Sequence, residues 1–122
     1  METTVQVLLG LIAVVHVWFL VLEMFLWFKP IGLKTFNKDL ETAKSSQALA
    51  ANIGLYNGFL AAGLAWGLLD QDPGSAFSIR MFFLTCVAVA GVFGAATASR
   101  RIFWVQALPA LIALALIISA RG

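Results

Sequence analysis

Four long apolar runs, separated by short polar connections, account for most of the chain. They extend from Val5 to Phe28, from Ser46 to Leu69, from Ser78 to Ser99 and from Ile102 to Ser119. Each run is close to the roughly 20 residues that a helix needs to cross about 30 Å of hydrocarbon. None shows the strict apolar–polar alternation of membrane strands. The pattern predicts an all-α integral membrane protein, a bundle of four transmembrane helices forming a single domain over residues 1–122.

The connections between the runs support this division. A polar loop over residues 29–45 opens with Lys29-Pro30-Ile31-Gly32, which is a helix-stopping signal. The segment from Asp70 to Gly74 is typical of a turn. Arg100-Arg101 leaves so little chain between the last two runs that the third and fourth helices should be antiparallel neighbours.

Composition points to lipid as the surrounding solvent. The chain is 61% hydrophobic and 11% charged with a net charge of +2, whereas about a quarter of the residues in a soluble domain are charged. No basic patch interleaved with aromatic residues suggests a nucleic-acid partner. The first run starts after Glu2 and lacks a basic flank and a small-residue cleavage site. It is therefore interpreted as a retained helix and not a signal peptide.

Basic residues predict the orientation. The loops after the first and third runs carry Lys29, Lys34, Lys38, Lys44, Arg100 and Arg101. Only Arg80 and Arg121 lie toward the other side, next to the acidic turn. Because basic residues accumulate on the cytoplasmic side, the loops after the first and third runs are predicted in the cytoplasm. With four spans, both termini then lie outside.

Polar residues within the runs are the candidate functional residues, because buried polar groups in hydrocarbon are costly. In the first run His16 and Glu23 are two helical turns apart and share a face, which Trp27 continues at i+4. In the second run Asn52 and Tyr56 share a face, and Asn57 points away from Asn52.

Counting 1.5 Å per residue from the inner helix ends arranges these residues in two layers. Glu23, Asn52 and Gln106 lie about 6–9 Å deep, and His16 and Tyr56, with Asn57 as a further candidate, lie about 15–18 Å deep. Together the two layers predict a polar pocket that opens toward the cytoplasm and is lined by His16, Glu23, Asn52 and Tyr56.

The leading hypothesis is a protein that binds or acts on a small lipophilic molecule. Low dielectric disfavours the charged forms of Glu23 and His16, so both could exchange protons near neutral pH, and Tyr56 could assist them. Ligand contacts are expected from Asn52, Asn57, Trp27 and Gln106. The alternatives are a proton-coupled transporter or channel subunit and a structural accessory subunit, and whether the protein is an enzyme stays open. His16 and Glu23 are too few ligands for a metal site, and no motif indicates a cofactor.

Small residues form stripes that favour close helix packing. Gly54, Gly58 and Ala62 recur every four residues in the second run. The third run carries two such stripes, which are Ala90, Gly94 and Ala98 beside Gly91, Ala95 and Ser99. Two stripes exceed what one neighbouring helix needs, and a homo-oligomer is therefore predicted.

Two segments carry a family resemblance. They are the stretch from His16 through Glu23 to Trp27 and the run Asn52-Ile53-Gly54-Leu55-Tyr56-Asn57-Gly58-Phe59-Leu60-Ala61-Ala62-Gly63-Leu64. Together they resemble the DUF1304 family of small bacterial membrane proteins, in which glutamine is expected at position 53. The resemblance covers nearly the whole chain and implies a bacterial inner-membrane location but no activity.

A weaker, architectural likeness is to the four-helix MAPEG enzymes. The likeness rests on Asn52. This chain has Ala48 and Leu55 where the MAPEG group tends to have arginine and glutamate.

Overall fold

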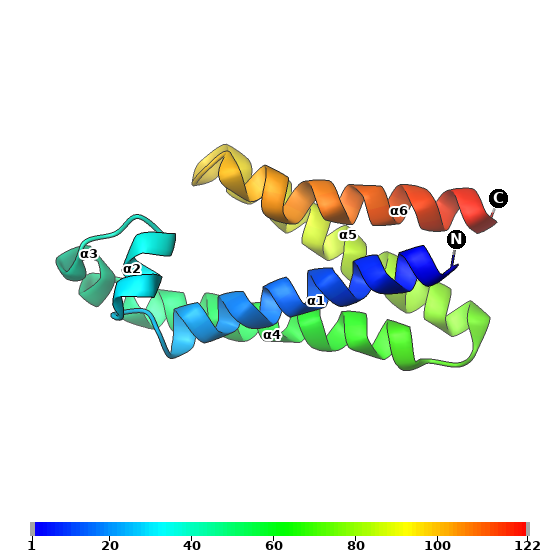
Figure 1. The fold of residues 1–122 in the computed structure, drawn as a ribbon, viewed down its shortest axis with the longest axis horizontal. Helices are drawn as coiled ribbons and strands as arrows, with labels where there is room; N and C mark the ends of the chain where they lie inside the picture. Colours follow the sequence, from blue (N-terminus) through cyan, green and yellow to red (C-terminus); the bar gives the residue numbers. More distant parts are fainter. Residues whose placement is uncertain (1, 122) are drawn as a thin grey trace. The chain divides into compact units, whose positions relative to one another are not determined.

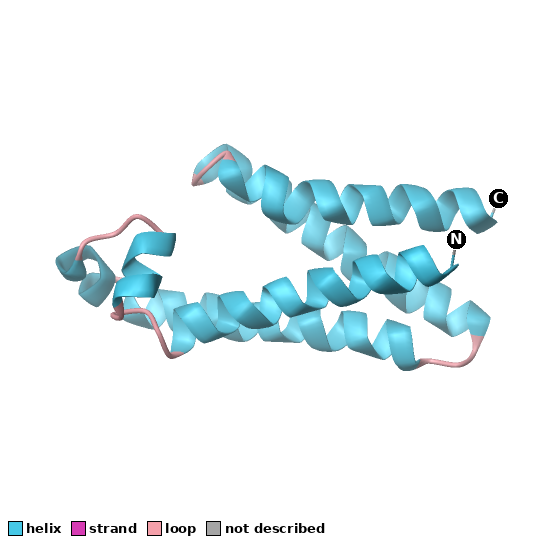
Figure 2. Ribbon diagram, viewed as in Figure 1, coloured by secondary structure: helices cyan, strands magenta, loops and turns pink. Residues whose placement is uncertain are grey.

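The computed structural model describes residues 2–121, which contain helices and no strand. Three long helices are α1 (Glu2–Met24), α4 (Gln47–Leu69) and α5 (Pro73–Thr97), and a short π-helix, η1 (Phe103–Ala107), runs into α6 (Leu108–Arg121) (Figure 1). Two short helices, α2 (Pro30–Thr35) and α3 (Leu40–Ser45), lie within the predicted polar loop. Figure 2 shows the loops that join these helices.

Four of the helical segments are long and apolar enough to cross a membrane, counting η1 and α6 together as Phe103–Ala120. This confirms the predicted all-α fold class with four candidate spans. The chain is a multi-pass membrane protein by the length and composition of these segments.

The chain divides into two compact units. Within the described residues, unit 1 contains 2–13 and 60–121, and unit 2 contains 14–59. The division passes through α1 and α4, so each of these helices contributes one half to each unit. That the whole chain forms one domain stays a prediction.

Unit 1 has its own apolar core. Its buried members are Val5, Leu9, Ile12, Leu64, Leu84, Val87, Ala88, Ala110, Ala113 and Ile117. Helix α5 packs against both η1 and α6. A Cβ atom added to Gly91 of α5 would lie only 2.6 Å from the backbone nitrogen of Ala107, so glycine permits this close approach. The predicted pairing of the last two long helices is confirmed.

Helix α5 begins at Pro73, five residues before the predicted start at Ser78. Asp72 is the N-cap, and its carboxylate accepts a 2.9 Å hydrogen bond from the backbone N–H of Ser75. Proline suits the first helical position, where its missing N–H has no helical partner in any case. The prediction was wrong because it treated this Asp-Pro pair as part of a turn when it also starts a helix.

Helix α1 ends at Met24, four residues before the predicted end at Phe28. The N–H of Leu26 bonds to the carbonyl of Val21, and Lys29 is extended immediately before Pro30, as a residue preceding proline prefers to be. Trp27 therefore lies beyond the helix and does not continue the stripe of His16 and Glu23.

The α2–α3 segment of unit 2 has a small core. The Trp27 indole N–H donates a 2.8 Å hydrogen bond to the carbonyl of Ala43, and both residues are buried with Ala50 against Leu33 and Phe36. The amide of Lys38 bonds to the carbonyl of Leu33, and Asn37 has a φ of 53°. These features define a Schellman motif at the end of α2, with asparagine in the left-handed position.

Candidate functional site

Helices α1 and α4 come into close contact within unit 2. A Cβ atom added to Gly54 would lie 2.8 Å from Cγ of Met24 and 3.0 Å from Cβ of Glu23. One added to Gly58 would lie 2.6 Å from Cδ1 of Leu20. Gly54 and Gly58 of the predicted small-residue stripe thus lie on a helix-packing face, whereas Ala62 is exposed. This face brings α4 side chains within reach of Glu23.

At this contact the Asn57 side chain donates a 2.7 Å hydrogen bond from Nδ2 to Oε1 of Glu23. Glu23 is only 8% exposed, and Asn57 is half-buried. The one ion pair found among the described residues joins Arg80 to Glu2. Glu23 is therefore a buried carboxyl group with a neutral amide as its hydrogen-bond partner.

The sequence placed Asn52 in the same layer as Glu23, but the hydrogen bond to Glu23 comes from Asn57. Asn52 is exposed, and Tyr56 is 56% exposed with its ring 6.3 Å from that of Phe59. Because Gly54 and Gly58 form the face of α4 that packs against α1, Asn57 lies on the side that meets Glu23. Asn52 and Tyr56 consequently belong to an outward face of α4 and do not join Glu23 in unit 2.

The other predicted site residues are spread over the chain. His16 is fully buried, and its ring meets that of Phe19 edge-on at 5.8 Å. Trp27 packs in the small core of the α2–α3 segment. Gln106 is half-buried in η1 of unit 1, so its predicted layer with Glu23 stays a prediction. Among the described residues, no three His, Cys, Asp or Glu side chains form a group that could hold a metal ion.

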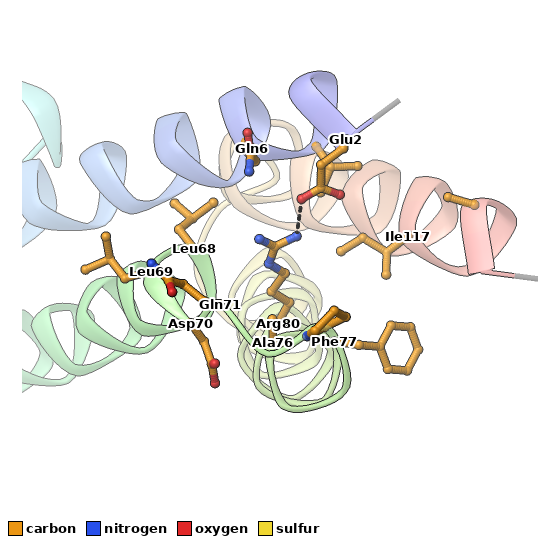
Figure 3. Close-up of a pocket in the computed structure, with 13 residues that line it drawn as sticks. Glu2, Gln6, Leu68, Leu69, Asp70, Gln71, Ala76, Phe77, Arg80 and Ile117 are labelled. Atoms are coloured by element: carbon orange, nitrogen blue, oxygen red, sulfur yellow. Dashed lines mark hydrogen bonds and ion pairs between the residues drawn. The ribbon is translucent and has the colours of Figure 1, made fainter.

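Unit 1 contains a polar site that the sequence interpretation missed. The side chain of Arg80 is 10% exposed, and its Nε donates a 2.8 Å hydrogen bond to the carbonyl of Gly67. Its Nη1 donates a 2.8 Å hydrogen bond to Oε1 of Glu2, which completes the ion pair (Figure 3). A Cβ atom added to Gly67 would lie 2.8 Å from Cγ of Arg80. A larger residue at position 67 would therefore displace the Arg80 side chain.

A pocket of about 730 Å³ opens beside this ion pair. Its wall combines Arg80, Glu2 and the amide residues Gln6 and Gln71 with apolar side chains such as Leu68 and Ile117. The signal that could have revealed the site was Asp72-Pro73. A helix that starts there places Arg80 two turns inside the span and not at its edge.

The family comparison confirms the resemblance drawn from the sequence. The model of the family described as "Protein of unknown function (DUF1304)" matches residues 10–118. The chain belongs to the DUF1304 family. That match includes Glu23, Asn57 and Arg80, and it leaves Glu2 outside. No curated protein and no solved structure matches this DUF1304 protein, and the weaker MAPEG likeness stays a prediction.

Proposed function

We propose that this DUF1304 protein binds, and acts by proton exchange on, a small lipophilic molecule within the membrane, with Glu23 as the proton-carrying group. The observation that carries the proposal is the 2.7 Å hydrogen bond from Asn57 to the buried Glu23 carboxyl. A carboxyl group held by a neutral amide can take up or release a proton without breaking an ion pair. Ionisable residues inside transmembrane segments are functional candidates by default, because their burial is expensive.

Asn57 orients the carboxyl group of Glu23 in this proposal. Its amide nitrogen fixes one oxygen of Glu23, which leaves the other oxygen to meet a ligand or a proton donor. His16, on the same face of α1, is the second candidate for proton exchange. Tyr56 and Asn52 would contribute only if the ligand or a neighbouring subunit covers the exposed face of α4.

The experiment compares the purified wild type with Glu23→Gln and with Glu41→Gln, which makes the same chemical change at an exposed position on α3. Infrared difference spectra across a pH titration report the carbonyl band of a protonated carboxylic acid. We expect one titrating buried carboxyl in the wild type and in Glu41→Gln, and its loss in Glu23→Gln. A panel of long-chain alcohols, aldehydes and quinones is then screened by thermal shift. A stabilising compound whose pH dependence survives Glu23→Gln would contradict the acid–base role.

The alternative function is proton-coupled transport, for which the same buried carboxyl would serve as a relay. Liposomes that contain the protein and an internal pH dye distinguish the two. A proton flux abolished by Glu23→Gln favours transport, whereas ligand binding without flux favours the first proposal. A protein that shows neither response has the structural accessory role.

The cellular setting is also part of the proposal. We place the protein in the bacterial inner membrane, with both termini outside and the α2–α3 segment in the cytoplasm. The proposed assembly is a homo-oligomer of four-helix bundles. Gly94 packs inside the chain, because a Cβ atom added there would lie 3.0 Å from Cγ2 of Ile102. The surface proposed for a second copy is the apolar groove of α5, lined by Phe82, Thr85, Cys86, Val89, Ala90 and Phe93.

A further inference from the structure

The pocket of unit 1 is separate from the Glu23–Asn57 pair and shares no residue with it. Its volume of about 730 Å³ falls in the usual range of small-molecule sites, roughly 300–1,000 Å³. It contains a nearly buried guanidinium group, two amide side chains and an apolar wall. These are the elements needed to bind an amphiphile with a negatively charged head.

The two partners of the Arg80–Glu2 ion pair differ in how firmly they are held. The Arg80 side chain is 10% exposed and is anchored through Nε to the carbonyl of Gly67, whereas the Glu2 side chain is 64% exposed. An exposed partner gains little from an ion pair in water. Glu2 can therefore return to water at small cost to itself, whereas the nearly buried Arg80 loses its partner, and a ligand anion that replaces Glu2 offsets that loss.

The chemistry of the replacement follows from the contact that is present. The Glu2 carboxylate occupies the position in front of Nη1, so a carboxylate head fits there (Figure 3). Gln6 lies one turn after Glu2 on α1, and its side-chain amide can hydrogen-bond to the second oxygen of the head group. The apolar side chains of Leu68 and Ile117 offer contact to a hydrocarbon chain.

The other acidic residue of the pocket does not compete for the guanidinium. Asp70 accepts a 2.6 Å hydrogen bond from the Ser75 hydroxyl and a 2.9 Å bond from the amide of Asp72. Figure 3 shows its carboxylate directed away from Arg80. Once Glu2 moves, Arg80 thus has no carboxylate of its own unit in front of Nη1.

We propose that this pocket binds a long-chain carboxylate, whose head group replaces Glu2 on Arg80 and whose chain lies against the apolar wall. Glu2 then acts as an internal competitor that occupies the site when no ligand is bound. A phosphate head, whether on an alkyl phosphate or on an anionic phospholipid, is the nearest alternative chemistry.

The test measures binding to the purified full chain in a neutral detergent at mildly alkaline pH. The probes are oleate, oleyl alcohol with the same chain but no charge, and dodecyl phosphate. A parallel arm uses nanodiscs with and without phosphatidylglycerol. The variants are Glu2→Gln, Arg80→Gln and, as a charge-matched control for the first, Glu41→Gln on the exposed side of α3.

We expect oleate to bind and oleyl alcohol not to bind. Arg80→Gln should weaken oleate binding by roughly tenfold or more, because a hydrogen bond to a charged group is lost. Glu2→Gln should tighten oleate binding, since the internal competitor is removed, and Glu41→Gln should leave it unchanged. If Arg80→Gln does not fold, the comparison of Glu2→Gln, which should tighten oleate binding, with Glu41→Gln, which should not change it, still tests the proposal.

Three outcomes would overturn the proposal. Equal binding of oleate and oleyl alcohol would show that only the chain is recognised. Unchanged or weaker oleate binding in Glu2→Gln would show that the ion pair only stabilises the fold and does not compete with the ligand. Binding of dodecyl phosphate without oleate, or exclusion of oleate by phosphatidylglycerol, would assign the pocket to a phosphate head group.

Discussion

Nδ2 of Asn57 and Oε1 of Glu23 are joined by a 2.7 Å hydrogen bond that connects α4 to α1. The bond uses one donor of the amide and one oxygen of a carboxyl group that is 8% exposed. It makes the two helices interdependent at the position where Gly54 lets them approach.

This relationship gives a first prediction on stability. Glu23→Ala removes the acceptor and leaves the Asn57 amide unsatisfied, which should lower the free energy of unfolding by about 1–3 kcal/mol. Glu23→Gln keeps the shape and an acceptor oxygen and should cost less. Thermal unfolding in detergent measures the order. If Glu23→Gln proved as destabilising as Glu23→Ala, the charge and not the hydrogen bond would hold the helices.

A second prediction concerns the contact between α5 and η1. Gly91→Ala places a Cβ atom 2.6 Å from the backbone nitrogen of Ala107, so one helix must move. The expected loss is about 1–3 kcal/mol of stability, as in other overpacked cores. Gly10→Ala in α1 is the matched control, because nothing lies within 4 Å of its added Cβ. It should be neutral or slightly stabilising, and equal losses at both positions would refute the close packing.

The third prediction is the pH response at the start of α3. A hydrogen bond from the Thr42 backbone N–H to the Asp39 carboxylate, 2.7 Å long, lowers the pKa of that carboxyl below its ordinary value of 3.8. Because the pKa is lower in the folded state, the contribution to stability is complete above that ordinary value. It is lost as the pH falls through the lower folded pKa.

Hydrogen exchange of the α3 amides during an acid titration measures this effect. Protection should fall at the acid end in the wild type. In Asp39→Asn it should be independent of pH there, because asparagine also caps helices but does not titrate. Asp39→Ala should show weak protection throughout. An identical acid response in wild type and Asp39→Asn would mean that another group is responsible.

The fourth prediction is the membrane orientation. Single cysteines at Lys38 and Gln71 are introduced into a Cys86→Ala background, since Cys86 is the protein's only cysteine. An impermeant maleimide should label Gln71→Cys in intact cells and Lys38→Cys only after lysis. The reverse result would invert the topology and with it the side from which each unit is reached.

The sequence was sufficient for the class of fold and insufficient for the helix register. Apolar runs of about 20 residues identify membrane helices because hydrocarbon leaves few other structures for them. Helix ends depend on local contacts that composition does not show. The hydrogen bond from Trp27 to Ala43 holds the residues after Met24 outside α1. The face of α4 that meets α1 is set by the contacts of Gly54 and Gly58, and it brings Asn57 and not Asn52 to Glu23.

Arg80 illustrates the same limit from the other end of a helix. Counted from Ser78 it is a terminal residue at the interface, but counted from Pro73 it is two turns deep. Its partner Glu2 is 78 residues away along the chain, and no spacing rule connects them. The capping residue Asp72 was the available local signal, whereas the pocket is formed by residues that only the fold brings together.

The π-helical turn at the start of α6 has a consequence for how this region can change. In a π-turn each backbone hydrogen bond spans five residues, one more than in an α-helix. The stretch Phe103–Ala107 therefore contains one residue more than the same length of α-helix would. Deleting one residue there would remove the surplus and let α6 continue as regular helix, while the segments before and after the turn kept nearly the same relative direction. Ile102 and Ala107 could then stay against Gly94 and Gly91 of α5. This turn is therefore a position where the chain can change in length by one residue without rotating α6 against α5.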